Sequence, residues 1–290
     1  MKQAYYAANP VDAQLALDLL AEQGIEAHVQ GGFLSGAAGE LPVGELLRVW
    51  VGDADLARAK SLLAARARGE GAIESDALDP LFETSWRRAW AGLATQAEGV
   101  GLRDDLLAAW SQPQRRYHTL RHLRDCLAQL EPVLALAEHA GEVEMALWFH
   151  DAVYDPKAAD NEARSAAWAE NALAAAGVEA GARQRIHALV MATRHEAQPA
   201  GRDQQLLVDV DLSILGTDAD RFDEYEVEVR EEYAWVPAPL FRHKRRQILQ
   251  EFLARPEIYS TPAFAARFEA PARANLARAL ERLRPWWRTW

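Results

Sequence analysis

Histidine and aspartate residues recur at short spacings in the middle of this 290-residue sequence. His118 and His122 are four residues apart, so on one helix they would share a face. His150 and Asp151 are neighbours, which diverge by about 100° on a helix and approach one point only if they flank it closely. A metal ion is such a point, because imidazole nitrogen and carboxylate oxygen can both bind it.

Asp211 is a further candidate for the same site. It follows the apolar run of residues 206–210, where a carboxylate would be costly to bury without a partner. Singly, each feature has an ordinary structural explanation, such as a surface histidine pair or an aspartate that caps a helix. Their occurrence in this order, within sequence rich in tryptophan and leucine, favours a shared site.

Three further residues have both a functional and a structural interpretation, and a fourth has only a structural one. Asp155, four residues after Asp151, could share its helix face and orient a water molecule or a ligand histidine, or it could end the helix. His195 could bind a second metal ion or a phosphate, or lie at a helix end. Arg245 could hold a substrate phosphate bidentately, although its basic neighbours are typical of a solvated helix face. Cys126 is predicted to belong to the core.

These residues lie beyond residue 80, where the sequence pattern is helical. Apolar residues recur at helical spacing, and strand-like sequence is absent apart from the short apolar run at residues 206–210. We therefore predict an all-α domain over residues 81–290. Its last six residues, PWWRTW, are predicted to dock against the domain or a partner and not to take part in chemistry.

The first 68 residues have a different pattern. Short apolar or aromatic runs typical of strands alternate with helical patterns, in the order β-α-β-β-α. The predicted strands are residues 2–7, 25–29 and 47–51, and the predicted helices are residues 11–23 and 53–65. Residues 69–80 are polar, acidic and marked by glycine and proline, which predicts a linker.

This first segment resembles a family of small prokaryotic domains described as signal-transducing proteins, with a ferredoxin-like, PII-like shape. The resemblance rests on YYAANPVDAQLALDLLAEQGIEA, GELPVGE and VWVGDADLARAKSLL, and it covers residues 1 to about 68. It implies a small α+β domain with a regulatory or binding role. A regulatory ligand would bind at the Gly-rich loop of residues 31–39, because glycine lets backbone amides approach an anion. A packing or dimerisation domain without a ligand is the alternative.

The second segment resembles the HD superfamily of metal-dependent phosphohydrolases and the related cyclic-nucleotide phosphodiesterases. The carrying pattern is Tyr-His-x-x-x-His, then His-Asp, then Asp-Leu-Ser. A bacterial group of predicted HD-superfamily phosphohydrolases shares RRYHTLRHL, LWFHDAVYD, DNEARSA, TRHE and VDVDLSILG, over roughly residues 80–283. The resemblance implies that His122, His150, Asp151 and Asp211 bind the metal and that His118 protonates the leaving group.

Composition and charge narrow the partners. The net charge of −11 argues against a broad nucleic-acid surface, since such surfaces are basic. No apolar stretch approaches the roughly 20 residues that span a bilayer, and the N-terminus lacks the apolar core of a secretory signal. The single cysteine excludes an intramolecular disulfide, so cytoplasmic residence is the default expectation.

The sequence therefore predicts a metal-dependent phosphohydrolase that acts on a nucleotide or another small phosphate ester. Mixed nitrogen and oxygen ligation suits Mn, Fe, Co, Ni or Zn, which can make water nucleophilic near neutral pH. An HD-type diiron oxygenase is one alternative, and it would need extra ligands such as His195 and Asp155. A non-catalytic signalling or binding protein with a structural metal is the other.

Overall fold

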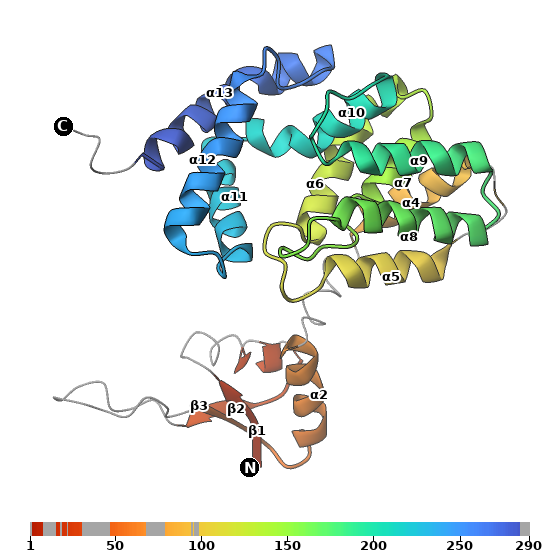
Figure 1. The fold of residues 1–290 in the computed structure, drawn as a ribbon. Helices are drawn as coiled ribbons and strands as arrows, with labels where there is room; N and C mark the ends of the chain where they lie inside the picture. Colours follow the sequence, from red (N-terminus) through yellow and green to blue (C-terminus); the bar gives the residue numbers. More distant parts are fainter. Residues whose placement is uncertain are drawn as a thin grey trace. The chain divides into compact units, whose positions relative to one another are not determined.

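The computed structural model describes residues 2–7, 16–17, 19–21, 23–30, 47–67, 79–93, 95 and 99–284. The chain divides into two compact units, Met1–Ser75 and Asp76–Trp290. The first holds a small antiparallel sheet with helix, and the second is helical (Figure 1). The predicted pairing of a small α+β region with a large helical region is confirmed.

The small unit has a three-stranded sheet in the order β1-β3-β2. Strands β1 (Lys2–Ala7) and β2 (Ala27–Gln30) are both antiparallel to β3 (Leu47–Val51), so they run parallel to each other on either side of it. This is the strand order of a split β-α-β unit. Val49 and Val51 on one face of β3 are buried, as the twofold alternation of a strand requires.

The helical parts of the small unit complete its core. Helix α2 (Leu56–Ala67) contributes Ala59 and Leu63, and the helical residues described between positions 16 and 21 contribute Ala16 and Leu20. In the helix predicted over residues 11–23, residue 23 lies in a turn, and residues 11–15, 18 and 22 lie outside the described residues. So do the Gly-rich loop and all of the predicted linker except its last two residues.

The large unit contains helices connected by short loops around one core. In chain order they are α4 (Pro80–Gly92), α5 (Val100–Trp110), α6 (Leu120–Leu130), η1 (Glu131–Leu136), α7 (Ala140–Phe149), α8 (Asn161–Ala175), α9 (Ala180–Ala192), α10 (Arg202–Asp211), η2 (Leu212–Gly216), α11 (Ala219–Glu232), α12 (Ala238–Ala254) and α13 (Pro262–Arg282). The apolar run at residues 206–210 is part of α10, so its strand-like appearance was misleading. Among the described helices, none is both long and apolar enough to cross a membrane. The Trp-rich residues 285–290 lie outside the described part.

Helix α7 is the centre of this unit. Every residue from 141 to 150 is buried, and α7 packs against α4, α6, α8, α9 and α10. Such all-round burial explains why its sequence is apolar without a polar stripe. Its two buried glutamates are paired, since Glu144 accepts hydrogen bonds from Arg88 and Glu142 accepts them from Arg185.

A close backbone contact fixes α7 against α4. A Cβ atom placed on Gly92 would lie 2.8 Å from the Cα atom of Gly141. No side chain fits between the two helices at this point, so their backbones meet directly. Gly141 is at the beginning of α7, and His150 follows its end.

Candidate metal centre

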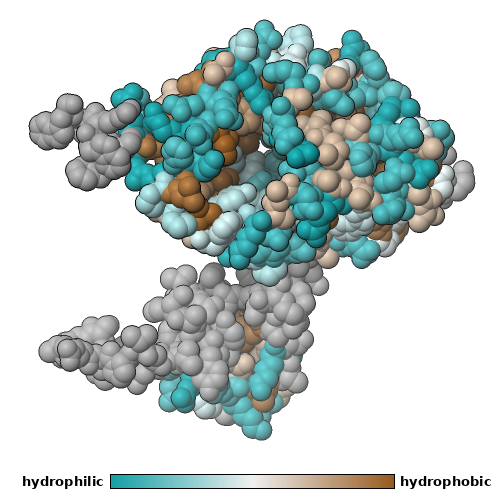
Figure 2. Space-filling model, viewed as in Figure 1, coloured by the Kyte–Doolittle hydropathy of each residue, from teal (hydrophilic) through white to brown (hydrophobic). Residues whose placement is uncertain are grey.

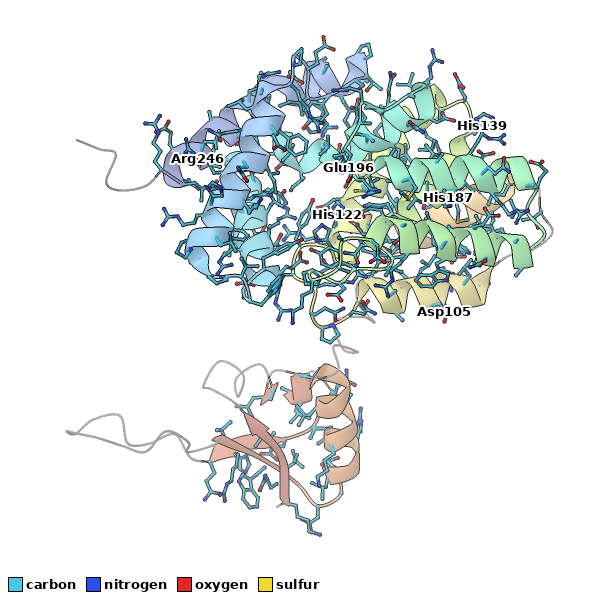
Figure 3. All side chains as sticks on the ribbon, viewed as in Figure 1. Asp105, His122, His139, His187, Glu196 and Arg246 are labelled. Carbon is cyan, nitrogen blue, oxygen red and sulfur yellow. The ribbon has the colours of Figure 1, made fainter. Side chains whose placement is uncertain are left out.

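Two histidines and two aspartates from three segments of the helical unit lie close together, and Figure 3 labels one of them, His122. His122 lies on α6, His150 and Asp151 directly follow α7, and Asp211 ends α10. The imidazole Nε2 atoms are 3.2 Å apart. Asp211 Oδ1 lies 3.2 Å from His122 Nε2, and Asp151 Oδ2 lies 3.3 Å from His150 Nε2. The four residues predicted as ligands are thus close together.

Local structure directs both imidazoles toward this point. The face of α6 that carries His122 is buried, so the ring points into the unit. After α7 ends at Phe149, the Nδ1–H of His150 donates to the Leu147 carbonyl oxygen at 2.8 Å. That hydrogen bond leaves the Nε2 atom of His150 available to a metal. The Trp110 ring packs beside both imidazoles, with its centroid 5.3 Å from that of His150.

Burial and neighbouring charges shift the pKa values of three of these four side chains. Burial would raise the pKa of Asp211, but hydrogen bonds from neighbouring imidazoles hold it well below its ordinary value. Burial would lower the pKa of His150, but the charges of Asp151 and Asp211 raise it to about 9. At His122 burial dominates and lowers the pKa. Two carboxylates and two imidazoles are a donor set that fits a divalent transition metal, whose charge would replace the proton on His150.

Cys126 is a donor that the sequence reasoning left out. It is buried, as predicted, and its Sγ atom lies 3.7 Å from His122 Nδ1. His122, Cys126, His150 and Asp211 offer ligand atoms within 4.8 Å of one another. Burial raises the pKa of the thiol well above its ordinary value, so it stays protonated near neutral pH. The carboxylate of Asp151, 3.3 Å from His150 Nε2 and 3.8 Å from His122 Nε2, is the alternative fourth donor.

His118 reaches the site by a different route from the one predicted. Helix α6 begins at Leu120, so His118 lies before the helix and the expected shared helical face with His122 is wrong. The side chain is nevertheless close, because His118 Nε2 lies 3.9 Å from Asp151 Oδ2. Its Nδ1–H donates to Glu232 Oε2 at 2.7 Å. The ring is thus held beside the cluster without joining it.

Glu232 holds this loop, and the sequence analysis missed it. Its side chain is fully buried at the end of α11. Oε1 accepts the backbone N–H groups of Arg116, Tyr117 and His118 at 2.8 to 3.0 Å, and Oε2 also accepts the Tyr154 hydroxyl. Burial would raise the pKa of Glu232, but its hydrogen bond to His118 lowers it to about 2. The available sequence signal was weak: Glu232 continues the buried face of α11 at helical spacing.

Asp155 does not occupy the predicted position. The prediction assumed that it shared a helix face with Asp151, but α7 ends at Phe149 and the chain turns. Asp155 is exposed, and its carboxylate accepts the backbone N–H of Lys157 at 2.9 Å. Its backbone N–H donates to the Asn161 side chain. Asp155 thus shapes the turn before α8. A cavity adjoins the cluster of His122, His150, Asp151 and Asp211, and Asp155 is not among the described residues that line it.

His195 and Arg245 lie in the wall of that cavity. His195 Nε2 is 3.1 Å from Asp211 Oδ2, and its φ of 56° is a left-handed conformation rare outside glycine. Arg245 is buried, and its Nε–H donates to Glu226 at 3.1 Å while the guanidinium lies over the Tyr225 ring. Its charge is therefore already paired, so a phosphate would compete with Glu226.

The cluster opens onto a cavity of about 670 Å³. His118, Asp151, His195 and Asp211 line one part of it, and most of the rest is lined by residues of the α7–α8 connection, η2, α11, α12 and the α11–α12 connection. In Figure 2, hydrophobic side chains gather beside a hollow over the region of α11 and α12. Ligand sites are typically concave and largely apolar with a few polar groups, which describes this cavity.

Comparison with known proteins concerns mainly the small unit. Residues 1–67 match a family described as "Putative prokaryotic signal transducing protein". This agrees with the resemblance noted for the first 68 residues. Neither a curated protein nor a solved structure matches the chain.

Proposed function

We propose that this protein is a metal-dependent phosphohydrolase of the HD superfamily that acts on a small phosphate ester. The observation that carries the proposal is the meeting of His122, His150, Asp151 and Asp211 at one end of a cavity. A histidine outside this set, His118, lies directly beside it. These four side chains would hold a divalent transition metal such as Mn, Fe, Co, Ni or Zn. The bound ion would lower the pKa of water to about 7 and offset phosphoryl charge.

His118 is the proposed general acid. Burial would lower its pKa, but the charges of Asp151 and Glu232 raise it, which favours the protonated ring near neutral pH. Its Nδ1–H is held by Glu232, so the Nε2–H is the transferable proton. A water oxygen adds to phosphorus, the ester P–O bond breaks, and the departing oxygen takes the proton from His118 Nε2. The products are an alcohol and phosphate.

Arg115 and Glu232 position this acid. The buried Arg115 guanidinium donates to the carbonyl oxygens of His118 and Asp151 at 3.0 and 2.8 Å. One cation therefore ties the segment with the acid to the segment with a ligand. Glu232 fixes the ring on the other side. Such support from neighbouring groups is what holds a proton donor in a productive geometry.

A diiron oxygenase is the second candidate because His195 lies next to Asp211. It would extend the donor set toward a second ion. Asp155, the other residue expected to help, is in the turn before α8, so the described residues supply less than that alternative needs. In a purely structural metal site, the hydrogen bonds that hold His118 would have no evident purpose.

The small unit is proposed to regulate this activity. The match of residues 1–67 to a family described as signal transducing supports a binding or signalling role. We expect its ligand to be a small molecule, and we expect no nucleic-acid or membrane partner for the chain.

Metal analysis followed by an activity screen tests the proposal. Purified protein should contain a transition metal and hydrolyse nucleotides or other phosphate esters with Mn, Co, Ni or Fe better than with Mg. His122→Ala should lose metal and activity. His139→Ala is the matched control, because His139 lies in a surface group of acids and histidine. A metal-free, inactive wild-type protein would refute the proposal, and two irons with oxygen consumption would favour the oxygenase.

A further inference from the structure

We infer that the substrate is a phosphomonoester of a large, uncharged apolar alcohol, and that α12 forms the surface that binds this apolar group. This inference rests on the proposed function, because the phosphate would lie at the His122–Asp211 cluster. The new element is the apolar group, which would occupy the rest of the cavity. Three features support it: the apolar face of α12, the balance of charges in the wall, and the size of the cavity.

The first feature is a stripe of apolar side chains on α12. Leu240, Phe241, Ile248 and Phe252 all line the cavity and recur at helical spacing, so they share one face of the helix. Leu240 and Ile248 are 51% and 42% exposed. Large aliphatic side chains this open to solvent, grouped in a concave surface, are typical of ligand grooves and contact sites.

The apolar surface continues beyond α12. Trp235, in the connection between α11 and α12, lines the same cavity and is 53% exposed. One ring face is contacted by the Lys157 ammonium group, 5.7 Å from the ring centroid. Val236 and Leu212 add further aliphatic surface to the wall. A flat or extended apolar group would therefore have contacts on more than one side.

The second feature is the small number of unpaired cations. Arg245 is paired with Glu226, and Arg194 is paired with Glu196. Among the described residues of the wall, Lys244 is a cation with no ion pair, and Glu162 adds a negative charge. A diphosphate or triphosphate would bring several negative charges to a wall that offers little compensation, whereas a monophosphate needs the cluster alone.

The third feature is size. The volume of about 670 Å³ lies within the range of small-molecule pockets, about 300 to 1,000 Å³. A short polar ester such as methyl or glycerol phosphate would leave most of the apolar wall uncovered. A substrate that covers it would gain binding energy from each buried methylene.

A homologous series of n-alkyl phosphates from methyl to hexyl tests the inference on the full-length, metal-loaded protein. Burial of each methylene should raise kcat/KM about fourfold until the wall ends. Binding of the matching n-alkylphosphonates, which are not hydrolysed, is measured by calorimetry in parallel. Their Kd values should fall with the same dependence on chain length.

Charged substitutions on the exposed stripe supply the variants. Leu240→Asp and Ile248→Asp should lower the ratio of kcat/KM for hexyl phosphate to that for methyl phosphate, and the affinity for hexylphosphonate, by about tenfold. Both positions are exposed, so the fold should tolerate them. Val227→Asp is the control, because Val227 is a 57% exposed apolar residue on α11 that does not line the cavity.

The outcomes separate this inference from the proposed function. Hydrolysis that is independent of chain length, or that favours nucleoside triphosphates, overturns the inference and leaves the phosphohydrolase intact. Chain-length-dependent phosphonate binding that Leu240→Asp weakens, with no ester hydrolysed under any metal, supports the apolar surface and refutes the hydrolase. Equal effects of Leu240→Asp and Val227→Asp would also overturn the inference.

Discussion

Among the described residues of the helical unit, two groups with histidine and acidic side chains are close enough to hold a metal, yet they differ in the hydrogen bonds that their atoms already make. At the surface, Glu138, His139 and Asp203 come together. Asp203 accepts the backbone N–H groups of Glu138 and His139 at 2.7 and 3.0 Å, and it also contacts His139 Nδ1. Its oxygens thus bind two backbone N–H groups in the segment that leads into α7.

The buried cluster has no such explanation. Asp211 Oδ1 and Oδ2 lie near the Nε2 atoms of His122 and His195, at 3.2 and 3.1 Å. His122 and His195 lie on different segments, and Figure 3 shows His122 inside the unit and His139 at its edge. Residue types and distances alone do not distinguish a candidate metal site from an acid that binds nearby backbone N–H groups. Burial and the absence of a competing backbone partner for Asp211 among the described residues favour the buried cluster as the candidate.

The largest expected effect is on metal content. His150→Ala removes a buried donor, so the purified protein should contain almost no metal and show no activity above background. Asp203→Ala in the surface group should keep the full metal content. Elemental analysis of both variants, after expression in the same medium, measures this difference. Loss of metal in Asp203→Ala but not in His150→Ala would reverse the assignment of the two groups.

The next effect separates an acid from a ligand. His118→Ala should keep its metal and lose about 10²- to 10⁴-fold in kcat on alkyl phosphates, because the leaving oxygen no longer receives a proton. With p-nitrophenyl phosphate, whose leaving group needs no proton, the loss should be much smaller. His139→Ala should lie within twofold of wild type on both substrates. Equal loss of metal in His118→Ala and His122→Ala would make His118 a ligand.

A smaller effect is expected on stability against acid. Because the folded-state pKa of Glu232 is about 2 against an ordinary 4.5, its contribution to stability is present above pH 4.5 and is lost as the pH falls toward 2. This shift corresponds to roughly 3 kcal/mol. Glu232→Gln should therefore destabilise the protein at pH 7 and much less near pH 3, as measured by urea unfolding.

A substitution in the surface group of Glu138, His139 and Asp203 is the control for this urea-unfolding measurement. Asp203→Asn should cost about 1 kcal/mol at pH 7, the usual contribution of one hydrogen bond, because the amide keeps only one accepting oxygen. A Glu232→Gln variant as stable as wild type at both pH values would contradict the role of Glu232 in holding the loop. Retention of the metal in this variant would show that any loss of turnover arises from the position of His118.

The smallest effect is expected from removing the small unit. Both groups of side chains lie within Asp76–Trp290, which has its own core. A chain that begins at Asp76 should keep its metal content and its kcat within about threefold of the full-length protein. Insoluble or metal-free protein would show that the small unit completes the helical one. A change in KM alone would agree with a regulatory role.

Local sequence predicted the elements better than the turns between them. The helical spacing of apolar residues predicted the all-helical character of the large unit, and the order of the motifs selected His122, His150, Asp151 and Asp211, which the structure places close together. The positions of His118 and Asp155 were derived by extending helices that in fact begin at Leu120 and end at Phe149. Helix ends depend on partners outside the local sequence.

Glu232 illustrates that dependence. It fixes the loop before α6 from 114 residues away, through hydrogen bonds that no local pattern encodes. In the sequence it is one of several glutamates on α11, and Glu231 beside it is exposed. Which of these acids is buried depends on the packing of the whole unit, so a single sequence could not select it.

The direct contact between Gly92 and Gly141 makes α7 a rigid spacer with the site at its far end. The ten residues of α7 span about 15 Å. Because the helix is tightly packed along that length, it cannot bend to compensate for a shift at its first turn. A methyl group at Gly141 would therefore push α7 away from α4 and displace the imidazole of His150. The geometry of the candidate metal site therefore depends on how closely two backbones pack at the other end of α7.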